Sequence, residues 1–345
     1  MIYRRRVAAL AISVISIAAC RTARPPEPPA EPAVAPLPAP EAHPAPRVPQ
    51  QGFVDVEGAG LWYRIEGNGP DTVLVFPAAY LEPFLSLGQD RFTLVRYDPR
   101  LRGRSRATTT SPRPTFQSDL RDLEAVADYL DVGRVSLVAF GYDAAVAVAF
   151  AAAHPDRVSR LVLLSPLEPR DSLGRSYNPP ERSVRLDTAR ARTLVKLRAA
   201  GRDTSDPQGY CRVFWEVNAP LFAAAPERLS PLAPWCEFPA ESPANLAGRL
   251  ASAIESLGKG YDLGPLARRV TSPVLIVAGE KDLVYNPAGA AVWAALLPRG
   301  RALLIPGAGH LAFAEAAEAA GSAVARFLGG EWPPGALRPP PSPRE

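Results

Sequence analysis

The chain has 345 residues, of which 39 are Lys or Arg and 35 are Asp or Glu, so its formal net charge is +4. Residues 1–19 contain three arginines and no acidic residue, and the rest of the chain therefore carries only +1. No basic stripe is evident in that remainder, so we expect no nucleic-acid partner.

The first twenty residues have the layout of an export signal. Three arginines, at positions 4–6, precede an apolar run at 7–17, and small residues lead to Cys20. The run is shorter than the roughly 20 residues of a membrane-spanning helix and fits a cleaved signal peptide. Its Ile-Ala-Ala-Cys end resembles the lipobox of bacterial lipoproteins, which implies cleavage before Cys20 and lipidation of that thiol. An ordinary signal peptide with an incidental cysteine is the alternative.

We therefore expect a protein exported to the bacterial cell envelope and anchored to a membrane, on its periplasmic side or at the cell surface. Pro and Ala dominate residues 24–50, a composition that forms extended spacers and no core. The predicted segments are a signal peptide (1–19), a lipid anchor with its Pro-rich linker (20–50), a core (51–166 and 267–330), an inserted helical cap (167–266) and a disordered Pro-rich tail (331–345).

Two cysteines remain when Cys20 is set aside. In an oxidising compartment Cys211 and Cys236 are disulfide candidates, and a bond across their 24 intervening residues is worth about 3 kcal/mol in the chain-entropy model. Two separately buried thiols are the alternative.

Hydrophobic periodicity predicts strands that alternate with helices. A hairpin is expected at 53–56 and 61–65, followed by strands at 72–76, 92–97, 135–138, 161–164, 274–278 and 302–305. Helices are expected at 116–130, 142–153, 188–199, 244–257, 287–297 and 312–328. This order predicts an α/β fold with a mostly parallel, doubly wound sheet. The pattern weakens between the strands at 161–164 and 274–278, so that region is interpreted as an insertion over the strand ends, where ligands of such folds bind.

Several segments match, in order, the α/β-hydrolase superfamily. The segments are Tyr97–Ser105, Ala151–Val158, Leu161–Pro166, Gly279–Asp282 and Gly307–His310. The chain is most similar to the capped proline iminopeptidase-like and esterase-like members. The resemblance implies a catalytic triad in the order nucleophile, acid, base, with Asp282 as the acid and His310 as the general base. Asp282 would hold the imidazole in the required tautomer.

The serine nucleophile of this family is absent from its expected position in the sequence. Its elbow motif, G-x-S-x-G, aligns with Ala139-Phe140-Gly141-Tyr142-Asp143, which puts Gly141 at the serine position. Glycine adopts the strained turn at no steric cost, but it offers no hydroxyl and forms no acyl-enzyme. The usual His-Gly after the third strand is also changed, to Pro77-Ala78. Backbone N–H groups of Ala79 and Tyr142 remain candidates for an oxyanion hole.

Other polar residues near these motifs have simpler interpretations. Asp143 is a possible displaced nucleophile, although a carboxylate also suits the start of a helix. Ser165 follows a strand and fits a turn, and His154 fits a packing or capping role. Tyr80, Tyr142 and Glu82 are unassigned pocket candidates, and His43 lies in the linker.

Three functions are compatible with these residues. The first is a hydrolase-family protein with impaired or lost serine hydrolysis that binds a small apolar or peptide-like ligand under its cap, or contacts a partner protein. The second is an enzyme in which Asp282 and His310 perform general acid/base chemistry without a nucleophile. The third is weak hydrolysis from binding and oxyanion stabilisation alone.

The cap is rich in aromatic residues, and no motif predicts a cofactor or metal. The aromatic residues either line an apolar pocket or form the core of the cap itself: Tyr210, Phe214, Trp215, Phe222, Trp235 and Phe238.

Overall fold

A computed structural model describes residues 50–107, 113–229, 233–238 and 243–339, all of which belong to one compact unit, residues 36–345. The predictions for the signal peptide, for Cys20, for His43 and for the linker up to residue 49 lie outside the described residues. None of the described helices is both long enough and apolar enough to cross a membrane.

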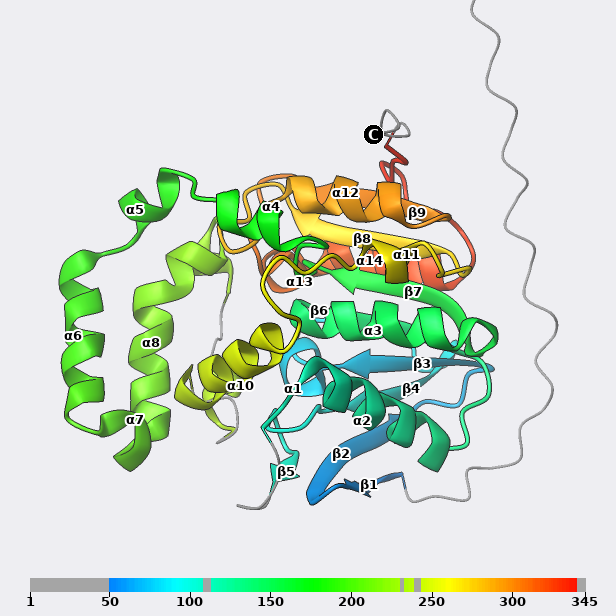
Figure 1. The fold of residues 1–345 in the computed structure, drawn as a ribbon, viewed down its shortest axis with the longest axis horizontal. Coiled ribbons are helices and arrows are strands. Elements are labelled where there is room, and N and C mark those ends of the chain that lie inside the picture. The colour runs from blue at the N-terminus through cyan, green and yellow to red at the C-terminus, as the bar shows by residue number, and fades with distance from the viewer. Residues whose placement is uncertain (1–49, 108–112, 230–232, 239–242, 340–345) are drawn as a thin grey trace, which may run out of the picture. The chain divides into compact units, whose positions relative to one another are not determined.

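The strands of the described chain form one sheet (Figure 1). They are β1 (Gln51–Val56), β2 (Ala59–Glu66), β3 (Asp71–Phe76), β4 (Phe92–Tyr97), β5 (Arg106–Ala107), β6 (Val135–Phe140), β7 (Val158–Leu164), β8 (Val274–Gly279) and β9 (Gly300–Ile305). The spatial order is β1-β2-β4-β3-β6-β7-β8-β9, with β5 paired to β2. From β4 to β9 all neighbours are parallel, whereas β2 is antiparallel to its partners. The predicted, mostly parallel α/β sheet is confirmed.

The helices of the described chain cover both faces of this sheet (Figure 1). They are α1 (Ala78–Leu81), α2 (Phe116–Tyr129), α3 (Tyr142–Ala153), α4 (Asp171–Ser176), α5 (Glu181–Arg185), α6 (Thr188–Ala199), α7 (Arg202–Ser205), α8 (Pro207–Phe222), α9 (Ala233–Cys236), α10 (Pro243–Glu255), α11 (Gly264–Ala267), α12 (Ala288–Leu296), α13 (Ala312–Glu315) and α14 (Ala317–Leu328). Helices α2, α3 and α12 pack on one face, and α13 and α14 pack on the other.

The centre of the sheet is made of residues that suit burial from both sides. All six residues of β6 are buried, as expected for a continuous apolar strand inside a parallel sheet. Helix α3 follows it after one residue, and its small side chains let it lie close against the strands. Helix α2 begins with a reciprocal cap, in which Thr115 and Ser118 each accept a backbone N–H from the other.

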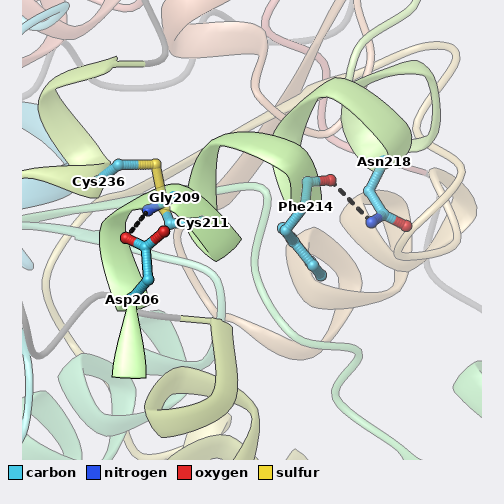
Figure 2. The surroundings of a disulfide bond; sticks show 6 residues. All are labelled: Asp206, Gly209, Cys211, Phe214, Asn218 and Cys236. Carbon is cyan, nitrogen blue, oxygen red and sulfur yellow. Dashed lines mark hydrogen bonds between the residues drawn. A yellow bond between two sulfur atoms is a disulfide. The ribbon is translucent and has the colours of Figure 1, made fainter. Parts of the chain in front are cut away.

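Helices α4 to α11 lie between β7 and β8 in the chain. All of them except the last residue of α11 fall within residues 167–266, which we call the cap segment. Figure 2 shows that Cys211 of α8 is bonded to Cys236 of α9, with the two Cα atoms 5.6 Å apart. Asp206 caps the N-terminus of α8, and its carboxylate accepts the Gly209 N–H at 3.0 Å. The disulfide candidates of the sequence are therefore joined in this structure.

Two sequence predictions need correction. The helix predicted at 312–328 is broken at Ala316, which leaves the helical region with φ −129° and ψ 52°. The prediction of a disordered tail is wrong for residues 331–339. There Leu337 exchanges backbone hydrogen bonds with Ala302 next to the sheet edge, and Trp332 packs against Phe327. An apolar anchor such as Trp332 lets a Pro-rich segment bury surface that its composition alone does not predict.

Candidate functional site

Gly141 forms the sharp turn between β6 and α3. Its φ of 61° and ψ of −125° lie where glycine is unstrained and other residues are disfavoured. The Gly141 N–H donates to the Leu164 carbonyl at 2.9 Å, and its own carbonyl accepts the Leu167 N–H at 3.0 Å. Among the described residues, chain neighbours aside, no heavy atom lies within 4 Å of the position that a Cβ would take. The elbow is therefore held by its peptide groups, and the side-chain position is open.

His310 and Asp282 meet at the carboxyl ends of neighbouring strands. The His310 Nδ1 lies 2.8 Å from Asp282 Oδ2, and the two residues are only 4% and 2% exposed. The other carboxylate oxygen accepts the N–H groups of Val284 at 2.7 Å and Tyr285 at 2.9 Å. Because a carboxylate only accepts hydrogen bonds, this contact favours the tautomer that has its proton on Nδ1 and its lone pair on Nε2. No residue in the described part of the chain forms a hydrogen bond with Nε2.

The loops that carry this pair are fastened by side chains from other elements. The Ser165 hydroxyl donates to the His310 carbonyl at 2.7 Å, so its polar group is already used in positioning the histidine loop. The Glu315 carboxylate accepts the N–H of Gly309 at 2.7 Å and that of Ala224 at 3.1 Å, which ties this loop to the cap segment.

The acid loop is held by the cap segment in the same way. The Tyr177 hydroxyl donates to the Asp282 carbonyl, and the Arg182 guanidinium donates to the Leu283 carbonyl. The positions of both members of the pair therefore depend on contacts with the cap segment.

Aromatic rings surround the histidine. Its ring centre lies 4.9 Å from Tyr285, 5.1 Å from Phe140 and 5.9 Å from Phe222 of α8. Tyr80 stacks on Trp235 at 4.3 Å and on Phe140 at 5.6 Å. The aromatic residues of the cap segment divide between the two predicted roles, which are lining the site and forming the core of the cap itself.

Some of them face the site and others face the cap itself. Trp215, Phe222 and Trp235 belong to the cluster around the site, which also holds Phe140. Tyr210 instead packs with Leu194 and Val217 inside the cap segment. Phe238 lies 4.6 Å from the guanidinium of Arg104.

The expected oxyanion donors differ in their availability. The Ala79 N–H donates to the buried Asp98 carboxylate at 2.7 Å, so in this structure it does not face a ligand. Tyr142 is the first residue of α3, where N–H groups have no partner within the helix. Ala79 can donate to an oxyanion only when its contact with Asp98 opens, so its role as a donor stays a prediction.

A buried charge cluster lies directly behind the elbow. Arg249 of α10 is 1% exposed, and its Nη2 lies 3.3 Å from both Asp143 and Asp119. The other oxygen of Asp143 lies 3.2 Å from Arg102, so both of its oxygens are in ion pairs. Asp143, considered from the sequence as a displaced nucleophile, therefore acts as an anchor for two arginines. The Tyr142 hydroxyl completes the cluster by donating to Asp119 at 2.9 Å.

The hydrogen bonding of this cluster is incomplete at Asp119. Its Oδ1 is buried and has no hydrogen-bond partner among the described residues. Burial raises the pKa of Asp119 to about 6, and the positive charge of Arg249 opposes that rise. This cluster could not be predicted from the sequence pattern, because one arginine and two acidic residues on three separate helices have the same spacing as solvated residues.

Asp119→Asn is expected to remove a pH dependence of stability. Because the folded pKa of about 6 lies above the ordinary value of 3.8, the folded state binds the proton first as pH falls. The stability of the wild type should therefore rise as pH falls from about 6 to about 4, by up to about 3 kcal/mol relative to the variant. Urea unfolding of both proteins between pH 4.5 and 7 measures this difference. A difference that stays constant across this range would contradict the shift.

The remaining predicted residues have structural partners. Glu82 pairs with Arg64 and lies 3.2 Å from Arg104. His154 Nε2 lies 2.7 Å from Glu124, in keeping with a structural role. Among the described residues no group of His, Cys, Asp and Glu is arranged to hold a metal ion.

Known proteins with the same architecture resemble this chain. A family model described as the alpha/beta hydrolase fold matches residues 79–317. The chain is 27% identical to a 2-(acetamidomethylene)succinate hydrolase of Mesorhizobium japonicum, over 80% of this chain and 94% of that protein.

Two solved structures share the fold with a TM-score of 0.60. One is an enol-lactonase from Burkholderia xenovorans, at 24% identity over 80% of this chain and 99% of that one. The other is a proline iminopeptidase from Mycobacterium smegmatis, at 19% identity over 81% of this chain and 97% of that one.

Proposed function

Since the chain belongs to the alpha/beta hydrolase fold family, we propose that it is a member in which covalent serine hydrolysis is impaired or lost and a small ligand binds beneath the cap segment. The observation that carries this proposal is Gly141, which keeps the elbow geometry without a nucleophilic atom. Two possible substitutes already have partners, because Asp143 is held in ion pairs and Ser165 donates to the His310 carbonyl. The ligand class that we favour is a small apolar or peptide-like compound.

Two measurements test this proposal. A fluorophosphonate probe should leave the wild-type chain unlabelled, and labelling of any serine would overturn the loss of the covalent step. Trp215 and Trp235 lie in the aromatic cluster around the site, so binding should change tryptophan fluorescence. Titration with phenyl acetate and with proline β-naphthylamide provides one ester-like and one peptide-like probe. A fluorescence that responds to neither probe would overturn the proposed ligand class.

A second candidate is hydrolysis through the histidine–aspartate pair alone, favoured by the 2.8 Å contact between His310 and Asp282. In this reaction Nε2 takes a proton from water, and the hydroxide adds to the carbonyl carbon of an ester. Nε2 then returns the proton to the leaving alcohol as the carbon–oxygen bond breaks. The Tyr142 N–H is the candidate donor to the oxyanion.

His310→Ala and Asp282→Asn test the second candidate. General base catalysis contributes about 10²–10⁴-fold, so each variant should lose that much of any hydrolysis of p-nitrophenyl acetate. His154→Ala is the matched control, because it removes a histidine that contacts Glu124, on α2. Equal rates in all four proteins would show that the pair does not act in catalysis. Any remaining hydrolysis would then come from binding and oxyanion stabilisation.

We also propose that the protein is exported and lipid-anchored at Cys20. The support is the sequence of residues 1–20, together with a disulfide that suits an oxidising compartment. Mass spectrometry of the chain from a bacterial membrane fraction should find a diacylated Cys20 at the new N-terminus, and Cys20→Ser should release the protein. A chain with an unmodified Cys20 would contradict this proposal.

A further inference from the structure

Positive charge is concentrated in a short part of the cap segment. Residues 181–202, which span α5 and α6 and reach the start of α7, contain seven basic and two acidic residues, a net +5. The chain after residue 19 sums to +1, so all of its other residues together carry −4. These residues are spaced irregularly along the chain, so they form no basic stripe in the sequence.

The fold presents five of these basic residues to solvent. Helix α6 packs against α8 through Leu194 and its neighbours, and its other side has no packing partner among the described residues. Figure 1 shows α6 on the side of α8 that faces away from the sheet. The exposed basic residues are Arg190, Arg192, Lys196, Arg198 and Arg202. Of these, Arg192 and Lys196 lie on the side of α6 opposite the buried Leu194, and we call this pair the basic face. Arg182 and Arg185 are excluded because they donate to backbone carbonyls.

The other three exposed basic residues each have an acidic neighbour. Asp187 lies 3.7 Å from Arg190, Asp203 lies 3.6 Å from Arg198, and Asp206 lies 2.9 Å from Arg202. Arg192 and Lys196, one helical turn apart, form no ion pair with the described residues. These two cations are therefore available to an external anionic partner.

Two valines in the same part of the chain are also exposed. Val184 is 83% exposed and Val195 is 70% exposed, a high value for a large apolar side chain. At 100° per residue, Arg192, Val195 and Lys196 fall within about 100° of the circumference of α6. One side of α6 therefore combines positive charge with the exposed Val195, and α5 adds the exposed Val184.

We propose that the basic face and the two valines form a docking surface for an anionic phospholipid bilayer. A bilayer interface accepts both components, because its headgroups attract Arg and Lys while its acyl boundary takes up apolar side chains. A nucleic acid would satisfy the charges and leave the valines in water. The proposal does not depend on the hydrolase chemistry or on lipidation at Cys20.

Vesicle binding tests this surface directly. The chain 21–345 contains the whole compact unit from residue 36 and lacks Cys20. It should sediment with vesicles of mixed phosphatidylglycerol and phosphatidylcholine at low ionic strength, and not with phosphatidylcholine alone. R192E/K196E should weaken binding to the anionic vesicles by about 30-fold or more, since each basic residue near such a surface contributes about fivefold. R269E/R299E is the matched control, because it makes the same charge change at two other exposed arginines.

A second pair of variants separates the bilayer from a nucleic acid. V184S/V195S should weaken vesicle binding by about tenfold and leave any binding to double-stranded DNA unchanged. Equal binding to anionic and neutral vesicles, or equal binding by the wild type and R192E/K196E, would overturn the proposal. So would binding to DNA without binding to vesicles, or vesicle binding that V184S/V195S leaves unchanged. Thermal unfolding of each variant checks that the fold is retained, which is expected because all four residues are exposed.

Discussion

Gly141→Ser is expected to create a serine nucleophile. The turn already has the elbow conformation, and no described atom outside the neighbouring residues lies within 4 Å of the new Cβ. His310 is held by Asp282 with its Nε2 unbonded, as a general base requires. Removing the nucleophile of a serine protease lowers kcat by about 10⁶-fold. The contact between Ala79 and Asp98 withdraws one oxyanion donor, which is worth about 10²–10³-fold. We therefore expect hydrolysis of p-nitrophenyl acetate to rise by about 10³-fold.

Two further variants make this result specific. Gly141→Ala introduces the same Cβ into the same backbone conformation, which is expected to cost about 1–3 kcal/mol, but it supplies no hydroxyl. It should remain unlabelled by a fluorophosphonate, whereas Gly141→Ser should be labelled at position 141. Adding His310→Ala to the serine variant should abolish the labelling. A folded Gly141→Ser protein that is neither labelled nor active would mean that the oxyanion loop or the cap segment also prevents the reaction.

The main elements of this site could be predicted because local sequence determines them. The apolar strand and the small-residue helix on either side of Gly141 fix the elbow, and their predicted bounds differ from the observed ones by no more than two residues. Asp282 and His310 were placed by family resemblance at the ends of consecutive strands, where a parallel sheet brings side chains together. The contact of Ala79 with Asp98 was not predicted, because it joins two loops whose spacing in the chain carries no periodic signal.

The cap segment was predicted less completely. Helix α6 was found with its observed bounds, but α8 was not, because it is apolar on more than one side and packs toward both the sheet and α6. A helix with two buried surfaces lacks the single apolar stripe on which prediction depends. The same limit applies to Arg249, whose burial follows only from where α10 lies against α2 and α3.

Arg249→Met is expected to cause the largest loss of stability among these variants. The substitution removes a guanidinium that lies 3.3 Å from both Asp119 and Asp143, and leaves the buried Asp119 with no ion-pair partner among the described residues. Removing one partner of a buried ion pair costs about 3–5 kcal/mol, a large part of the 5–15 kcal/mol that stabilises a typical domain. Urea unfolding at pH 7 measures the loss. Arg121→Met is the matched control, since Arg121 is exposed beside Glu57 and should contribute less than about 1 kcal/mol.

The pH dependence of this loss distinguishes an electrostatic origin from a packing defect. Without Arg249, the positive charge that most strongly opposes the rise in the pKa of Asp119 is lost, so this carboxyl should be neutral over a wider range of pH. The destabilisation should therefore be smaller at pH 5 than at pH 7, and Asp119→Asn should reduce it at pH 7 by about 0.5–3 kcal/mol. A loss that is the same at both pH values would indicate that Arg249 stabilises the protein by filling space. In the electrostatic case, hydrogen exchange should rise in α10 more than in α12, because Arg249 is the buried charge that joins α10 to the helices behind the elbow.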